Sequence, residues 1–100
     1  MIEATETTFR QIIKTQGTCL VNFTASWCAP CHSMQPALRQ LEQTTQIVVV
    51  AVDVQRCPNL ASSFNVKSVP TLVLMGPDGE VRRQVGSQNL SSLQSFVGAP

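Results

Sequence analysis

The clearest chemical feature of the sequence is a pair of cysteines, Cys28 and Cys31, separated by two residues. In a helix this spacing places the two sulfur atoms about one turn apart, close enough for a disulfide to form and break between them. The pair follows a run typical of a buried strand, Cys19–Ala25, and begins a predicted helix. Cys28 is therefore expected where free backbone N–H groups and the helix dipole stabilise an anion and favour its thiolate.

The helix that begins at the cysteine pair predicts a different role for each thiol. Cys31 lies at helical spacing with Met34, Leu38 and Leu41, so it is expected on the buried face. Cys28 would then be the thiolate that attacks a substrate disulfide, because the thiolate is the reactive form. Cys31 would attack the resulting mixed disulfide, releasing the reduced substrate and leaving Cys28 and Cys31 oxidised.

A zinc site is the main competing interpretation, because two cysteines at this spacing also form half of many zinc centres. Zinc needs four ligands, and the remaining candidates are Cys19, Cys57 and His32. These residues do not form a second pair at metal-ligand spacing. The sequence therefore favours redox chemistry with no bound metal, and a metal site and a merely structural cysteine pair are the alternatives.

Composition narrows the class of protein further. The chain has 100 residues, of which 43% are hydrophobic and 13% are charged, and its formal net charge is +1. The hydrophobic share is enough for a packed core and excludes wholesale disorder. The near-neutral charge gives no case for nucleic acid or an anionic membrane as partner, since both need clustered Lys and Arg. We expect one domain over residues 1–100, acting as a monomer.

Two further observations predict a soluble, cytoplasmic protein. The longest apolar run, Ile47–Val52, is far shorter than the roughly 20 residues that span a bilayer. The N-terminal stretch Met1–Gly17 carries Glu3 and Glu6 and lacks the apolar core of a signal peptide. Without an export signal, the cysteines indicate redox chemistry or small buried side chains rather than the structural disulfides of a secreted chain.

Hydrophobic periodicity predicts alternating helices and strands. The expected helices are Thr7–Thr15, one starting at Cys28, Pro58–Phe64 and a last one capped by Asn89. The expected strands are Cys19–Ala25, Ile47–Val54, Thr71–Met75 and Glu80–Val85, the last two joined as a hairpin. Strands separated by helices imply a parallel core. The predicted fold class is α/β, a mixed central sheet with helices on both faces.

The cysteine pair lies in a longer pattern that resembles the thioredoxin family. The sequence Trp27-Cys28-Ala29-Pro30-Cys31 matches the family's motif, which usually has Gly where Ala29 stands. Val69-Pro70-Thr71 matches the family's cis-proline segment, and Val85-Gly86 matches the residues before the last helix. The order of the predicted elements agrees as well, so the resemblance covers almost the whole chain.

The resemblance implies a thioredoxin-like fold and a thiol–disulfide oxidoreductase that reduces protein disulfides. Electrons would come from a thioredoxin reductase, and the Cys28–Cys31 disulfide would serve in place of a cofactor. An apolar platform around the reactive sulfur would consist of Trp27, Ala29, Pro30, Val69, Pro70 and Gly86. Extended substrate segments would dock there through main-chain hydrogen bonds near Val69. The family also implies a cis peptide bond between Val69 and Pro70.

Two other functions remain open at this point. The same fold could act as an oxidant or a disulfide isomerase, although Pro30 between the cysteines favours a reductant in this family. The chain could also be a binding or chaperone module with little turnover. The two intact motif cysteines argue against such a module, whereas the departures from the family pattern leave room for it.

The main departure from the family lies beneath the motif. Asn22 stands where thioredoxins carry a buried Asp, and Ala51 stands where they carry the opposing Lys. The loss of both charges together leaves neither one buried without a partner. The missing carboxylate is the group thought to take the proton from the resolving cysteine. A water molecule and Asp53 are the candidate substitutes.

Three other side chains need an interpretation. His32 replaces the basic residue usual just after the motif, and it either favours the Cys28 thiolate or is a solvated surface histidine. Cys57 precedes Pro58 at a predicted helix start and is either a regulatory thiol or a small, partly buried side chain. A small, partly buried side chain is the favoured interpretation for Cys57, and the same interpretation is favoured for Cys19.

Overall fold

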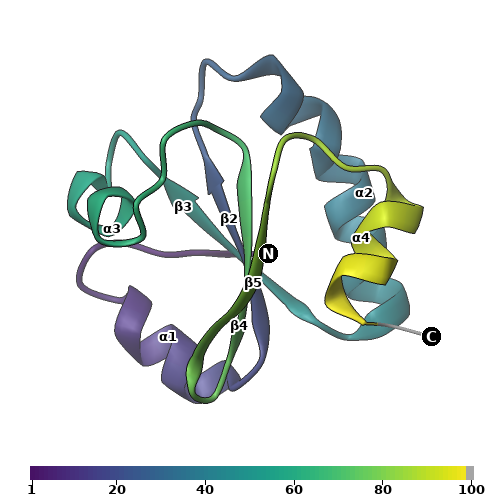
Figure 1. The fold of residues 1–100 in the computed structure, drawn as a ribbon, viewed down its shortest axis with the longest axis horizontal. Helices are drawn as coiled ribbons and strands as arrows, with labels where there is room; N and C mark the ends of the chain where they lie inside the picture. Colours follow the sequence, from purple (N-terminus) through teal and green to yellow (C-terminus); the bar gives the residue numbers. More distant parts are fainter. Residues whose placement is uncertain (99–100) are drawn as a thin grey trace.

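Residues 1–98, which the computed structural model describes, contain five strands in one mixed sheet (Figure 1). The strands are β1 (Ile2–Glu3), β2 (Cys19–Thr24), β3 (Val48–Asp53), β4 (Thr71–Gly76) and β5 (Gly79–Val85). Their order across the sheet is β1-β3-β2-β4-β5. β3 is parallel to both β1 and β2, whereas β4 is antiparallel to β2 and β5. The predicted mixed sheet is confirmed, and β2 is its central strand.

Helices cover both faces of the sheet, as the sequence predicts (Figure 1). The helices of the described residues are α1 (Phe9–Gln16), α2 (Ala29–Thr45), α3 (Pro58–Ser63) and α4 (Leu90–Val97). α1 and α3 lie on one face, and α2 and α4 lie on the other. Asn89 caps α4 as predicted, since its Oδ1 accepts the Ser92 N–H at 2.9 Å. None of the helices described is long and apolar enough to cross a membrane.

The side chains of β2 alternate between two hydrophobic clusters, one on each face of the sheet. Val21 and Phe23 belong to the cluster under α1 and α3, whereas Leu20 belongs to the cluster under α2 and α4. The second cluster also contains Met34, Leu38, Leu41, Leu93 and Phe96, which come from those two helices. Burial of side chains of this size stabilises the fold by roughly 1.5–3 kcal/mol each. This packing fixes α2 against the sheet and places its first turn at the end of β2.

A short strand that the sequence does not predict completes the sheet. β1 is two residues long, too short to show a periodic pattern. It forms because Ile2 pairs with Val50 and Glu3 pairs with Ala51. The N–H of Ala4 extends the ladder by donating to the Ala51 C=O at 2.9 Å. The strand is therefore defined by its partner β3 rather than by its own sequence.

The predicted hairpin is present as β4 and β5, which turn through Pro77 and Asp78. Gly79 has φ +119°, a conformation that L side chains rarely adopt, so glycine is required there. The other predicted elements agree with the structure to within one or two residues at each end. The expected domain includes residues 99 and 100, which lie outside the described residues.

Candidate active site

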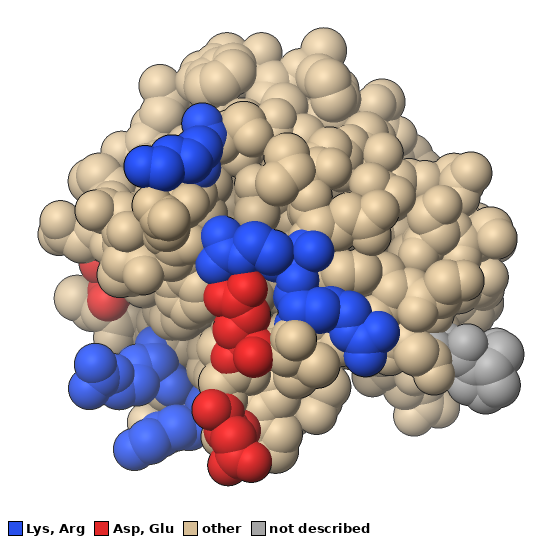
Figure 2. Space-filling view, viewed as in Figure 1, with Lys and Arg blue, Asp and Glu red and all other residues tan. Residues whose placement is uncertain are grey.

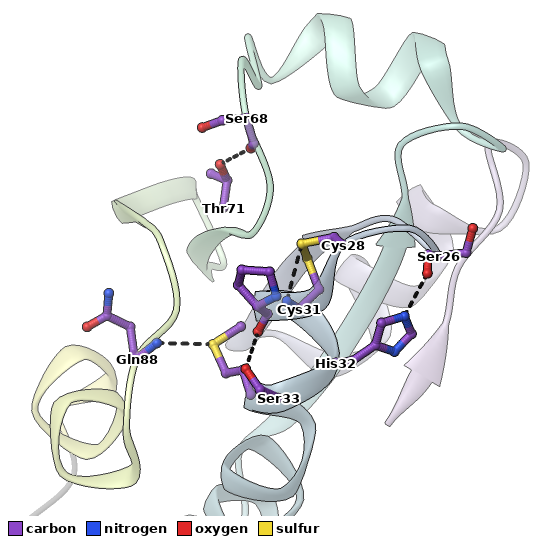
Figure 3. The surroundings of a disulfide bond; sticks show 10 residues. Ser26, Cys28, Cys31, His32, Ser33, Ser68, Thr71 and Gln88 are labelled. Carbon is purple, nitrogen blue, oxygen red and sulfur yellow. Dashed lines mark hydrogen bonds between the residues drawn. A yellow bond between two sulfur atoms is a disulfide. The ribbon is translucent and has the colours of Figure 1, made fainter.

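The two motif cysteines form a disulfide between the end of β2 and the start of α2 (Figure 3). Cys28 is the N-cap of α2, with an extended backbone (φ −92°, ψ 104°). Its Sγ accepts the Cys31 N–H at 3.2 Å. This hydrogen bond satisfies one of the N–H groups that the first turn of a helix leaves free. The predicted position of Cys28 at the helix start is confirmed.

Both cysteines are largely buried in the disulfide state. Cys28 is 4% exposed and Cys31 is 1% exposed, so Cys31 is the more buried of the two by a small margin. They pack with Ala25, and the partly buried side chains of Val54 and Val69 border this cluster. Access to the disulfide therefore depends on the residues that surround it rather than on a wide difference in exposure between the two sulfurs.

An exposed apolar surface borders the disulfide where the family resemblance predicts a platform. Trp27 is 66% exposed, and Ala29 and Pro30 are exposed at the first turn of α2. A groove of about 130 Å³ lies beside the motif and is lined by Trp27, Val54, Val66, Lys67, Ser68 and Val69. The sequence predicts Trp27 and Val69 as part of this surface, but it does not predict the other four lining residues. Residues 66–68 directly precede Val69-Pro70, which is the signal that could have identified them.

Charged side chains gather away from the start of α2 on the face shown in Figure 2. They lie mainly over the β4–β5 hairpin and α1, in the lower part of that view, whereas the upper part is mostly uncharged. The groove beside the motif has one charged residue in its lining, Lys67. The surface around the motif is therefore suited to segments recognised by apolar contact and main-chain hydrogen bonds rather than by charge.

The loop before β4 and the end of β5 are joined beside the disulfide. The Val69–Pro70 peptide bond is cis, as the family resemblance predicts. Pro70 is buried, and its C=O accepts the Gly86 N–H at 2.9 Å. The Oγ1 of Thr71 donates to the Ser68 C=O at 2.7 Å (Figure 3). These contacts place Pro70 and Gly86 next to each other, so the platform residues from two distant parts of the chain are brought together.

Asn22 is buried in β2 directly opposite Ala51 of β3, the position expected from the family pattern. It is 3% exposed, and its Oδ1 is the one buried side-chain oxygen or nitrogen in residues 1–98 that has no hydrogen-bond partner. A buried acceptor left without a partner costs about 1–3 kcal/mol. The site beneath the motif is therefore polar but carries neither of the two charges usual in the family.

His32 lines a cavity of about 120 Å³ together with residues of β1, β2 and β3. Its Nε2 lies 2.7 Å from the Ser26 C=O, and because a carbonyl only accepts, Nε2 is the donor. The imidazole is exposed and points toward Ser26, not toward either sulfur (Figure 3). Of the two interpretations offered by the sequence, the contacts agree with a surface histidine that is bonded to the main chain.

Asp53, the candidate substitute for the missing acid, lines the same cavity as His32 and Ala51. Its Oδ1 accepts the backbone N–H of Gln55 at 2.8 Å and that of Arg56 at 3.3 Å. The carboxylate therefore closes the turn after β3. Asp53 lies two residues after Ala51 on β3, so their side chains are on the same face of the sheet. Asn22 pairs with Ala51 in register and therefore shares that face.

The two remaining cysteines, Cys19 and Cys57, are free thiols that are buried. Burial raises the pKa of the Cys19 thiol. The pKa of the Cys57 thiol is raised by burial first and then by the negative charges of Glu6 and Asp53. Cys19 begins β2, whereas the disulfide follows the end of that strand. Within residues 1–98, no group of three or more His, Cys, Asp or Glu side chains is arranged to hold a metal ion.

A cysteine pair that forms a disulfide at the start of a helix is built for thiol–disulfide exchange. The fold and the site therefore define a thiol–disulfide oxidoreductase. Comparison with known proteins agrees, since the family model described as Thioredoxin matches residues 1–99. This chain belongs to the thioredoxin family, whose members are protein-disulfide oxidoreductases.

Individual relatives match along most of this chain. Thioredoxin C-2 of Corynebacterium nephridii is 36% identical, over 97% of this chain and 93% of its own length. A bifunctional thioredoxin reductase/thioredoxin of Mycobacterium leprae is 35% identical over 92% of this chain, which corresponds to 21% of that longer protein. Among solved structures, a mutant thioredoxin from Halobacterium salinarum has a TM-score of 0.90 and 30% identity, covering 96% of this chain and 86% of that one.

Proposed function

We propose that Cys28 is the nucleophile and Cys31 the resolving cysteine of a protein-disulfide reductase. In the reduced protein, the Cys28 thiolate attacks one sulfur of a substrate disulfide, and the other substrate sulfur leaves as a thiolate. The Cys31 thiolate then attacks the Cys28 sulfur, the Cys28–Cys31 bond forms, and the second substrate sulfur leaves. Two electrons pass to the substrate. The two protons lost by the cysteine thiols end on the two new thiols of the substrate.

The observation that carries this assignment is the hydrogen bond from the Cys31 N–H to the Cys28 Sγ, at 3.2 Å. A backbone donor at a helix start stabilises a thiolate on Cys28, and the thiolate is the form that attacks. Cys31 lies one turn into α2 and is buried, at 1% exposure, which suits a group that reacts only after substrate is attached. The relative positions of the two sulfurs therefore support Cys28 as the first to react.

Substrate docking is proposed along the groove beside Trp27 and Val69. An extended substrate segment would pair with main-chain groups near Val69, and apolar side chains would rest on Trp27, Ala29 and Pro30. Pro70 and Gly86 would complete the platform. The hydrogen bond that joins these two residues supports this part of the proposal. Asn22 is buried beneath the motif and His32 lies beside it at the start of α2, so neither is part of the platform. We propose that both modulate the site, His32 through its bond to the Ser26 C=O just before the motif rather than through contact with either sulfur.

The proposed electron donor is a thioredoxin reductase. The Mycobacterium leprae relative, named a bifunctional thioredoxin reductase/thioredoxin, supports this pairing. We further propose that the chain acts in the cytoplasm as a monomer and contributes to electron transport and redox homeostasis. A reducing compartment suits the two free thiols at Cys19 and Cys57. The disulfide itself supplies the redox chemistry, so no other cofactor is part of the proposal.

The reduction potential of the Cys28–Cys31 pair, measured against glutathione, tests this function. The potential of a thioredoxin-type reductant should be about −270 mV, whereas that of a disulfide isomerase is about −180 mV. Turnover of insulin disulfides with NADPH and a thioredoxin reductase should accompany the lower value. A potential near the isomerase value, or binding of insulin without turnover, would instead favour the oxidising enzyme or the binding module.

A further inference from the structure

Gln88, in the loop between β5 and α4, is the centre of a set of hydrogen bonds beside the disulfide. Its backbone N–H donates to the Met34 Sδ at 3.4 Å (Figure 3). Its side-chain Nε2 donates to the Gly86 C=O at 3.2 Å. Its Oε1 accepts from the Gln84 Nε2 at 3.0 Å. Gln88 therefore contacts α2 through Met34, the end of β5 through Gln84, and the loop after β5 through Gly86.

These bonds connect the helix that carries the cysteines to the loop that carries Pro70. Met34 is 1% exposed and lies about one turn beyond Cys31 in α2. At the other end, the Gly86 N–H donates to the Pro70 C=O at 2.9 Å. A continuous path of three hydrogen bonds thus runs from Met34 through Gln88 and Gly86 to Pro70.

Gly86 depends on this path because it has no side chain of its own that could pack against its neighbours. Its φ is +100°, and a Cβ built on it would meet no atom within 4 Å. Glycine loses more backbone freedom on folding than any other residue. Both of its peptide groups are held by partners, the N–H by Pro70 and the C=O by Gln88. The orientation of Gly86 is therefore set by hydrogen bonds, and Gln88 supplies one of the two.

We propose that Gln88 is a positioning residue that holds Gly86, and with it the Pro70 side of the platform, in a fixed relation to the cysteines on α2. The inference rests on the proposed function, in which protein substrates dock on this platform. Gln88 touches neither sulfur directly, so its loss weakens docking while the exchange at Cys28 proceeds as before. The expected signature is a change in KM and not in kcat.

The test compares the parent with Gln88→Leu, which keeps the size of the side chain and removes its two hydrogen bonds. Reduction of insulin is measured with dithiothreitol as the source of electrons, so that no reductase is involved. The KM for insulin should rise about 3- to 10-fold, with kcat changed less than about 2-fold. Gln84→Leu, which removes only the outer bond, should give a smaller rise. Gln43→Leu is the matched control, because Gln43 is an exposed glutamine on α2, and it should leave both KM and kcat unchanged.

A role in stability alone predicts a different result. Loss of folded protein would lower the apparent kcat and leave KM unchanged, and denaturant melts of each variant would report it. An unchanged KM for Gln88→Leu, with the parent active, overturns the inference but leaves the proposed function intact. A parent that fails to reduce insulin overturns the proposed function as well. If Gln88→Leu does not fold, the KM of Gln84→Leu decides, because an unchanged value there also contradicts the proposal.

Discussion

Asn22 and Ala51 face each other across β2 and β3, and the Asn22 Oδ1 has no hydrogen-bond partner in residues 1–98. The side chain opposite it is a methyl group, so nothing at this strand pair can neutralise a charge. A neutral amide costs less at such a place than a charged side chain would, because burying an unpaired carboxylate or ammonium costs far more. The pair explains why the chain can lack both charges and still fold around the motif.

Asn22→Asp should destabilise the protein in a pH-dependent way. Burial opposes ionisation, so the pKa of the new carboxyl should be higher in the folded than in the unfolded chain. Between these two values the folded state holds the proton more tightly. The free energy of unfolding, relative to the parent, should therefore fall as pH rises through this window and stay lower above it. Denaturant melts at about pH 4 and about pH 8 measure the difference, which we expect to be on the order of 1–3 kcal/mol.

Ala51→Lys provides the matched test of this prediction. In the double variant the ammonium lies opposite the carboxylate, so part of the lost stability should return at the higher pH. A double-mutant cycle measures the coupling between the two positions. Equal destabilisation by Asn22→Asp at both pH values, with no coupling to position 51, would contradict the buried site described for Asn22.

Local sequence patterns were sufficient to predict most of the elements that position the site. The apolar stripe through Met34, Leu38 and Leu41 predicts α2 because each contact of this face repeats at helical spacing. The turn at Pro77 and Asp78 predicts the hairpin because glycines flank it. In both cases the residues that determine the element are neighbours in the chain.

The features that could not be predicted depend on residues far apart in the chain. β1 exists only through its pairing with β3, and two residues carry no periodic pattern of their own. Val54 lines the groove beside Trp27 because the end of β3 lies next to the motif. The bond between Gln88 and Met34 spans 54 positions and joins a backbone N–H to a thioether. Neither residue type signals such a contact in advance.

The Glu80–Arg83 pair on β5 should shift the titration of its carboxylate but contribute little stability. Two hydrogen bonds of 2.7 Å from Arg83 lower the pKa of the Glu80 carboxyl below its usual range. Arg83→Gln should therefore raise the pKa of Glu80 in an NMR titration. Because the folded-state pKa is lowered, the pair stabilises the fold above the unfolded-state value, and this contribution is lost as pH falls through the folded-state value.

The loss of stability in Arg83→Gln near neutral pH should be below about 0.5 kcal/mol, because water and salt screen an exposed pair. Arg82→Gln is the control, since Arg82 is the neighbouring exposed arginine and no salt bridge to it is found in residues 1–98. Its effect on the Glu80 titration should be clearly smaller. A Glu80 pKa that does not respond to Arg83→Gln would show that the pair does not persist in solution.

Cys19 and Cys57 should resist alkylation in the folded, oxidised protein. They are 0% and 2% exposed, and burial raises the pKa of both thiols, so little reactive thiolate forms near neutral pH. Iodoacetamide followed by mass spectrometry should label neither thiol before unfolding and both after it. Rapid labelling of Cys57 in the native protein would contradict its description as a buried side chain and support a regulatory thiol.

The assignment of the two active-site thiols can be tested by trapping. In Cys31→Ser, Cys28 can still attack a substrate disulfide, but no second thiol is present to release it. A mixed disulfide between Cys28 and the substrate should therefore accumulate, and mass spectrometry of a mixture with oxidised insulin should detect it. Cys28→Ser should trap at most a few per cent as much, because Cys31 lacks the position at the helix start that favours a thiolate.

A common control makes the trapping result specific to the motif. The variants are compared in a background of Cys19→Ala and Cys57→Ala, which removes the two free thiols. Each of these buried side chains loses only its sulfur, so we expect the background to lose about 1–2 kcal/mol of stability in total and still to fold. Thermal melts of the background check this before trapping begins. An adduct carried by Cys31 in Cys28→Ser, at a yield equal to that of Cys31→Ser, would reverse the roles of the two cysteines. An adduct carried by Cys28 alone would establish that the thiol at the helix N-cap is the one that reacts first.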